Sequence, residues 1–185
     1  MNKCKFLSLP CSTKELESLN TGEMVYIKGT LITGRDAAHK RMIELIKKGQ
    51  PLPVELKDQA LYYVGPCPAK PGQVMGSCGP TTSSRMDVYT PMLLDLGLKI
   101  MIGKGQRDYS VIDAMIRNKA VYLAAIGGTG ALLSKCVRKA KVLAFEDLGT
   151  EAIYSLTVEN FPAIVAIDTK GNDLYKIGPT AFCRL

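Results

Sequence analysis

The chain has 185 residues, 46% of which are hydrophobic, so it can bury one sizeable core and is not an intrinsically disordered protein. Its formal net charge of +7 allows a nucleic-acid partner, but the basic residues are scattered and only 6% of residues are aromatic, so an ordinary basic surface is favoured. A site where several cations converge on a small anion stays open as a third interpretation.

Membrane and secretory signals do not stand out in the sequence. The longest apolar runs, such as residues 120–128, are about half the length of a membrane span, and residues 1–16 contain no secretory apolar region. We therefore expect a cytoplasmic protein with no membrane partner and no nucleic-acid partner. The default organisation is a single domain over residues 1–185, in which residues 1–20 form a loose arm or a strand.

The six cysteines contain no C-x-x-C pair and no spacing typical of a disulfide framework. They are Cys4, Cys11, Cys67, Cys78, Cys136 and Cys183. Reduced thiols, in the core or at the surface, are favoured over disulfides. An iron–sulfur or zinc site built by this chain alone is therefore not expected.

Strand and helix patterns alternate in the first half of the chain. Residues 24–34 are rich in β-branched side chains and nearly alternate in polarity, which predicts a strand. A helix comes next, with Asp36 as its N-cap and Gly49 at its C-terminal end. Residues 60–66 predict a second strand, and a loop rich in proline and glycine then continues to Pro80.

The alternation continues through the second half. Thr90 and Pro91 are typical of the N-cap and first turn of a short helix. The later elements are a buried strand at 99–103, a turn at 103–105, a helix at 108–118, a strand at 120–128, a helix or turn at 129–139, a strand at 140–149 and a β-hairpin at 161–178 that turns at 168–173. The pattern predicts an α/β domain with a mixed sheet, without fixing the strand order.

The stretch GPTTSSR, residues 79–85, concentrates polar groups ahead of a predicted helical turn. Thr81, Thr82, Ser83 and Ser84 supply hydroxyl groups, the turn supplies unpaired backbone N–H groups, and Arg85 supplies a guanidinium. Together these groups could bind an anion. The alternative is that one hydroxyl caps the turn while the others face water.

Two further cations come directly after predicted strands. Arg35 lies in TGRD after the strand at 24–34, and Lys104 lies between two glycines after the strand at 99–103. Taken alone, Arg35 is more typical of a solvated arginine in a strand–helix turn, and GKG is a weak signal that a simple tight turn also explains. Ligands in α/β folds commonly bind where strands end, so the recurrence with Arg85 favours one shared site. Three cations suit a substrate with two carboxylates, because a guanidinium can bind a carboxylate through two hydrogen bonds.

Other candidate sites have weaker support. The stretch GGTGALL, residues 127–133, lacks the third glycine of a dinucleotide-binding motif. His39 is the only histidine and lies near Arg35, so it is a minor catalytic candidate and more typically a structural residue. No Ser-His-Asp arrangement can be argued from this sequence.

The motifs TGRDAAHKR, YYVGP, GPTTSSRMD, YTP, GKG and AAIGGTGALL, in this order, resemble a known family. They resemble the β subunit, equivalent to the C-terminal domain, of iron–sulfur-dependent class I fumarases and L-tartrate dehydratases. The resemblance covers nearly all of residues 20–185. It implies a swivelling β/β/α domain, in which helices flank a mixed sheet, and the reversible hydration of a dicarboxylate, most directly of fumarate to L-malate.

The resemblance also implies roles for particular residues. Arg35 and Arg85 would bind substrate carboxylate, Lys104 would add a further catalytic and binding contact, and Thr81 would be the base that removes a proton from carbon. An unperturbed alcohol is a poor general base, so Thr81 would need a strongly positive field or a relay from a partner; otherwise it only donates a hydrogen bond. Cys78 stands where relatives have a small apolar residue, and we do not expect it to be a metal ligand.

The same resemblance implies what the chain lacks by itself. The family's [4Fe-4S] cluster is held by three cysteines of a separate α subunit, so this chain corresponds to the half without the cluster. The implied assembly is an αβ hetero-oligomer. The alternatives to a fumarase β subunit are an L-tartrate dehydratase β subunit and a noncatalytic dicarboxylate-binding module.

Overall fold

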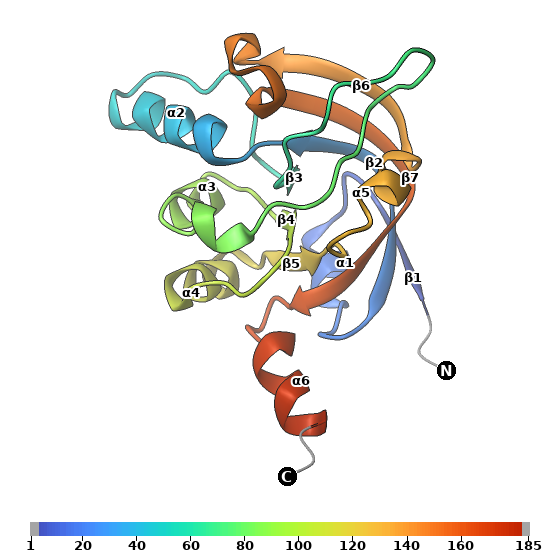
Figure 1. Cartoon of the computed structure of the whole chain (residues 1–185). Helices are drawn as coiled ribbons and strands as arrows, with labels where there is room; N and C mark the ends of the chain where they lie inside the picture. The colour runs from blue at the N-terminus through green and yellow to red at the C-terminus, as the bar shows by residue number, and fades with distance from the viewer. Residues whose placement is uncertain (1–3, 183–185) are drawn as a thin grey trace.

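A computed structural model describes residues 4–182 of the chain (Figure 1). The strands are β1 (Lys5–Ser8), β2 (Met24–Thr33), β3 (Ala60–Tyr62), β4 (Ile100–Gly103), β5 (Val121–Ala124), β6 (Val137–Ala144) and β7 (Ile153–Ile167). The helices are α1 (Thr13–Glu17), α2 (Asp36–Lys47), α3 (Thr90–Asp95), α4 (Tyr109–Asn118), α5 (Gly130–Ser134) and α6 (Leu174–Phe182), with 3-10 helices η1 (Ser83–Met86) and η2 (Glu146–Glu151). Among residues 4–182, no helix is both long and apolar enough to cross a membrane.

One mixed sheet organises the fold. The strand order is β1-β2-β3-β4-β5-β7-β6, and β2 also pairs with β7, so β2, β3, β4, β5 and β7 close into a five-stranded barrel. Neighbouring strands from β1 to β5 are parallel, whereas β7 is antiparallel to β2, β5 and β6. The predicted mixed α/β class is confirmed, and the closure of the sheet is a feature that the sequence pattern did not predict.

The length of β7 explains the closure. This strand has 15 residues, and one of its edges pairs with β2. Its other edge pairs first with β6, through residues 153–158, and then with β5, through residues 164–167. Register shifts in the pairings with β2 and β5 bend the ribbon, as bulges do. A single long strand therefore joins the two ends of an otherwise parallel sheet.

Alternating side chains divide the core into two layers. Tyr62, Ile100 and Ile102 point into the barrel, where they pack with Phe161. Tyr63, Met101 and Tyr122 point to the opposite face and pack with residues of α2, α3 and α4. Figure 1 shows these three helices stacked along one side of the sheet. Both faces of the parallel strands are thus buried, as is usual for parallel sheets.

Two predicted helix caps are wrong. Asp36 is the first residue of α2 and Arg35 is its N-cap; Thr90 is likewise the first residue of α3, after Tyr89. The side chain of Asp36 is used in ion pairs, and the Thr90 hydroxyl donates back to Met86 O at 2.8 Å. Local cap propensity was overridden in both cases by a different partner.

The predicted C-terminal hairpin is also wrong. β7 ends at Ile167, and residues 174–182 form α6 in place of a returning strand. The turn between them is held by Asp168, whose carboxylate accepts hydrogen bonds from the backbone N–H groups of Lys170 and Asn172. A turn of this composition is consistent with either a strand or a helix after it, because it specifies only the reversal of the chain.

Candidate functional site

Four glycine-containing turns lie at the carboxyl ends of the parallel strands β2 to β5. They contain Gly34, Gly65, Gly103 to Gly105, and Gly127 with Gly128. Hydrogen bonds connect them in order: Gly34 N donates to Tyr62 O at 3.1 Å, Tyr63 N to Ile102 O at 2.8 Å, and Ala125 N to Gly103 O at 2.8 Å. Because the strands are parallel, these turns meet at one edge of the sheet. The clustering predicted from strand ends is confirmed for the turns themselves.

The hydroxyl-rich stretch lies against this edge through its backbone. Thr81 N donates to Tyr63 O at 2.7 Å, and Ser83 N donates to Lys104 O at 2.9 Å. The predicted helical turn is the 3-10 helix η1, whose N-cap is Thr82; among the described residues, the side chain of Thr82 makes no capping hydrogen bond. Helix capping therefore does not account for this threonine.

Arg35 and Arg85 meet at a shared carboxylate. Asp36 Oδ1 accepts a hydrogen bond from Arg85 Nε at 2.9 Å, and Asp36 Oδ2 lies 3.3 Å from Arg35 Nε. The side chain of Arg85 is 52% exposed and that of Arg35 is 26% exposed. Both ion pairs use Nε, and within residues 4–182 the terminal guanidinium nitrogens make no hydrogen bond. Each arginine thus keeps donors available for an anion.

Glu151 is a member of this cluster that sequence reasoning missed. Its Oε1 lies 3.3 Å from Arg35 Nε, and its Oε2 accepts a hydrogen bond from Ala37 N at 2.9 Å. The carboxylate therefore satisfies the N-terminus of α2 while it holds the arginine in place. Glu151 lies 116 positions after Arg35 in the sequence, in η2, and no local pattern links the two.

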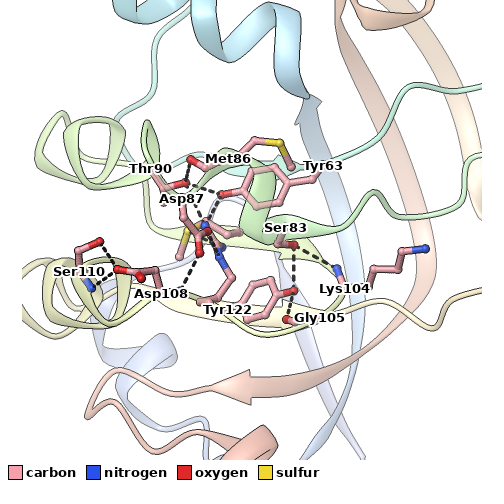
Figure 2. Close-up of polar contacts among 12 residues, drawn as sticks. Tyr63, Ser83, Met86, Asp87, Thr90, Lys104, Gly105, Asp108, Ser110 and Tyr122 are labelled. Atoms are coloured by element: carbon pink, nitrogen blue, oxygen red, sulfur yellow. Dashed lines mark hydrogen bonds and ion pairs between the residues drawn. The ribbon is translucent and has the colours of Figure 1, made fainter.

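Lys104 is half-buried, and its backbone is fixed by η1. Its N–H donates to Ser83 Oγ at 3.1 Å, and its side chain points away from Tyr63 and Tyr122 (Figure 2). A Cβ on Gly127 would lie 3.7 Å from Lys104 Cδ, so the side chain runs beside the glycine turn after β5. Arg35 and Arg85 share Asp36, but within the described residues Lys104 shares no carboxylate with either arginine.

A buried ion pair joins residues 81–87 to the loop after β4, and sequence analysis did not predict it. Arg107 Nε donates to Asp87 Oδ1 at 2.7 Å, and the arginine side chain is fully buried. Figure 2 shows the hydrogen bonds that continue from Asp87 to the backbone of Asp108 and from Tyr122 to Ser83. The only sequence signal is an arginine three residues after Lys104, which is not distinctive without knowledge of its burial.

His39 has a structural role in this fold. It is fully buried, its Nδ1 donates to Arg35 O at 2.9 Å, and its ring packs edge-on against Tyr63. Its Nε2 has no hydrogen-bond partner among residues 4–182. Burial lowers the pKa of the imidazole to about 4. His39 is thus held neutral and supports the backbone of Arg35, as expected for a structural histidine; its minor catalytic role stays a prediction.

The thiols do not form a metal site within the described residues. No three cysteine, histidine, aspartate or glutamate side chains gather there in an arrangement that could hold a metal ion. Cys78 is buried, and burial raises the pKa of its thiol to about 12, whereas a ligand must lose its proton. Cys183 lies outside the described residues. The donor set that the structure describes does not fit an iron–sulfur cluster.

Comparison with known proteins gives matches along most of the chain. Residues 3–178 match the family model described as Fumarase C-terminus. Fumarate hydratase 2 of Leishmania major is 40% identical over 88% of this chain, and the anaerobic class I fumarate hydratase of Escherichia coli K12 is 42% identical over 81% of it. The chain spans only 29% and 28% of the lengths of these two relatives.

A second group of relatives matches along nearly its whole length. The L(+)-tartrate dehydratase subunit beta of Escherichia coli K12 is 33% identical over 92% of this chain and 86% of its own length. Together with the family match and the glycine-turn edge that carries Arg35, Arg85 and Lys104, these similarities show that the chain belongs to the fumarase C-terminus family, homologous to class I fumarate hydratases and to L(+)-tartrate dehydratase β subunits.

Proposed function

We propose that this chain is the β subunit of a cytoplasmic hydro-lyase that reversibly hydrates a dicarboxylate, most directly fumarate to L-malate. The observation that carries the proposal is the pair of arginines on Asp36. Arg85 and Arg35 are held through Nε, at 2.9 and 3.3 Å from its two carboxylate oxygens, which leaves their terminal nitrogens available to other partners. Paired guanidinium groups of this kind recognise carboxylates.

The other candidates supply orientation and chemistry in this proposal. Lys104 adds positive charge beside the glycine turn after β5, where backbone N–H groups can approach a ligand closely. Thr81 accepts the proton from the carbon beside a carboxylate of the hydroxy acid, and its position is fixed by the 2.7 Å bond from its N–H to Tyr63 O. Fixed cations lower the cost of negative charge that develops on the substrate during proton removal.

Thr81 has one alternative role, in which it donates a hydrogen bond while a partner residue removes the proton. These two roles of Thr81 can be distinguished by measuring exchange of the malate C3 proton with deuterated water. If Thr81 is the base, Thr81→Ala loses hydration and proton exchange together, while Thr81→Ser retains both. Proton exchange that survives in Thr81→Ala would assign the base to the partner.

The edge that carries these residues is open, and we propose that an α subunit covers it. The [4Fe-4S] cluster belongs to that subunit in this proposal, since the donors described here do not fit one. The near full-length match to a tartrate dehydratase β subunit supports a split αβ enzyme.

Fumarate is the leading substrate in this proposal, because the fumarate hydratases compared are 38–42% identical to this chain, against 37% and 33% for the two tartrate dehydratase β subunits. The test is an anaerobic assay of the chain coexpressed with its α subunit, with fumarate, L-malate and L-tartrate offered separately. We expect turnover of fumarate and L-malate that requires both chains. Turnover of L-tartrate alone would reassign the substrate.

The lone chain provides the control for this assay. Expressed without the partner, the chain should be colourless and inactive, because the thiols of the described residues do not cluster into a site that could hold an iron–sulfur cluster. A stable iron–sulfur absorbance from the lone chain would contradict the two-subunit proposal. A stable, cluster-loaded complex that binds dicarboxylates but turns none over would favour a noncatalytic binding module.

A further inference from the structure

We propose that Arg107 is a positioning residue that fixes the two loops carrying Thr81, Arg85 and Lys104 relative to each other. This inference rests on the proposed function for its catalytic readout, and on the structure alone for its structural readout. The side chain of Arg107 has no exposed surface, so Arg107 is not a substrate ligand. Its contacts with Asp87, Tyr63 and Tyr122 instead reach the segments that carry the candidate site residues.

The first contact is with Asp87, two residues after Arg85. Arg107 Nε donates to Asp87 Oδ1 at 2.7 Å, while Asp87 Oδ2 accepts from Asp108 N at 2.6 Å. Asp87 is the C-cap of η1, the turn that includes Arg85. One carboxylate therefore ties the end of η1 both to the side chain and to the backbone of the loop after β4.

A second tie joins the same loops at their other ends. Ser83 N donates to Lys104 O at 2.9 Å, and Lys104 N donates to Ser83 Oγ at 3.1 Å. The Ser83–Lys104 and Asp87–Arg107 ties lie four and three residues apart on the two loops, on either side of Arg85. Two ties fix both the separation and the twist of two segments, whereas one tie would leave a hinge.

Two tyrosines extend the contacts of the guanidinium to the strands. It lies 5.2 Å from the ring centre of Tyr63 and 5.0 Å from that of Tyr122. Tyr63 O accepts the N–H of Thr81, and the Tyr122 hydroxyl bonds Ser83 Oγ at 2.9 Å and donates to Gly105 O at 3.0 Å. Burial raises the pKa of the Tyr122 phenol, so this hydroxyl keeps its proton.

The charge of Arg107 is compensated and its donors are used. Besides Asp87, its Nη2 donates to Thr90 Oγ1 at 3.0 Å and lies 3.4 Å from the Tyr63 hydroxyl, and its Nη1 lies 3.5 Å from Met101 Sδ. A lysine keeps the charge but lacks the planar fork that reaches these partners together. Arg107→Lys therefore loosens the loops while it limits the damage of an uncompensated carboxylate.

The test uses the αβ complex, four single variants and the Arg107→Lys/Asp87→Asn double variant. Arg107→Lys keeps the positive charge but removes the planar fork, and Asp87→Asn removes the negative charge of the buried pair. Leu16→Ala, in α1 at the other end of the barrel, is a control matched for lost stability, and Arg117→Lys is a control for the exchange of an exposed arginine that pairs with Asp95. Melting temperature, kcat, KM and backbone amide exchange are measured for all of them.

We expect Arg107→Lys to lower kcat/KM by about 10²-fold, mainly through kcat, since small displacements of positioned groups have effects of this size. Asp87→Asn should act similarly, and the double variant should lose no more than the worse single variant, because the two share one interaction. Leu16→Ala, with an equal loss of melting temperature, should stay within about 2-fold of the wild type. A parallel loss in Leu16→Ala, or additive losses in the double variant, would overturn the proposal.

Amide exchange decides the inference independently of turnover. In Arg107→Lys, exchange of residues 81–87 and 103–108 should rise about 10-fold or more, while that of residues 153–158 in β7 stays unchanged. Unchanged exchange in both loops would overturn the positioning role. If the wild-type complex turns over none of the three diacids, the proposed function fails and the exchange result still decides this inference.

Discussion

The two arginines that pair with Asp36 and the buried arginine that pairs with Asp87 use their donors in opposite ways. Arg35 and Arg85 share Asp36 through Nε, and Arg85 is 52% exposed, so both keep donors for another partner. Arg107 is fully buried and contacts Asp87, Thr90 and two tyrosine rings. A cation with unused donors at an edge indicates ligand binding, whereas a cation whose donors are used indicates a structural support.

Replacement of Arg85 by lysine provides the strongest test of this difference. Arg85→Lys should lower kcat/KM of the αβ complex by about 10²- to 10³-fold, because the single ammonium cannot bind a carboxylate through two parallel bonds. Its melting temperature should stay near that of the wild type, since the side chain is half exposed. Steady-state kinetics beside thermal unfolding check both parts, and near-normal turnover would remove Arg85 from the site.

A pH titration of stability tests the buried support under Arg35. The pKa of His39 is lowered from 6.5 to about 4 in the folded state, so the unfolded chain takes up a proton first as the pH falls. The contribution of His39 is thus complete above pH 6.5 and is lost toward pH 4, by about 3 kcal/mol. Denaturant unfolding of the wild type and of His39→Gln measures it.

The difference between those two pH profiles is the quantity of interest, because carboxylates contribute to both. The wild type should lose more stability than His39→Gln between pH 6.5 and pH 4. Parallel profiles for the two proteins would mean that the imidazole is not held neutral in the fold.

The close packing under Lys104 is tested with Gly103→Ala. A Cβ at this position would overlap Ser83 Oγ, the group that accepts the N–H of Lys104. We expect a loss of about 1–3 kcal/mol in the free energy of unfolding, as for other overpacked sites. Gly178→Ala is the matched control: it lies in α6 with open space around its Cβ and should be neutral or slightly stabilising. Equal stability of the two variants would contradict the close contact.

The smallest effect is expected for an arginine outside both groups. Arg117 pairs with Asp95 at 2.8 Å, but the two side chains are 58% and 49% exposed. Arg117→Ala should change the free energy of unfolding by less than about 1 kcal/mol, because water and salt screen such pairs. It should leave kcat/KM unchanged. A kinetic effect as large as that of Arg85→Lys would show that exposure and unused donors do not identify the functional arginines.

Local patterns predicted the elements better than their ends. The strand at 24–34 and the helix at 108–118 are β2 and α4 within one or two residues. The hairpin at 161–178 is wrong, because residues 174–182 are helical. Alternation and helical periodicity report which face of a segment is buried, but a turn such as 168–173 does not report the type of the next element.

The sequence by itself determined the order of strands and helices from β2 to β5, the glycine turns after these strands, and the placement of Arg35 and Lys104 in those turns with Arg85 close by, because these features depend on residues close together in the chain. The tertiary structure alone decided the closure of the sheet by β7, the burial of Arg107 against Asp87, and the contact of Glu151 with Arg35. These contacts join distant segments, and the burial that makes them strong exists only after the chain has folded.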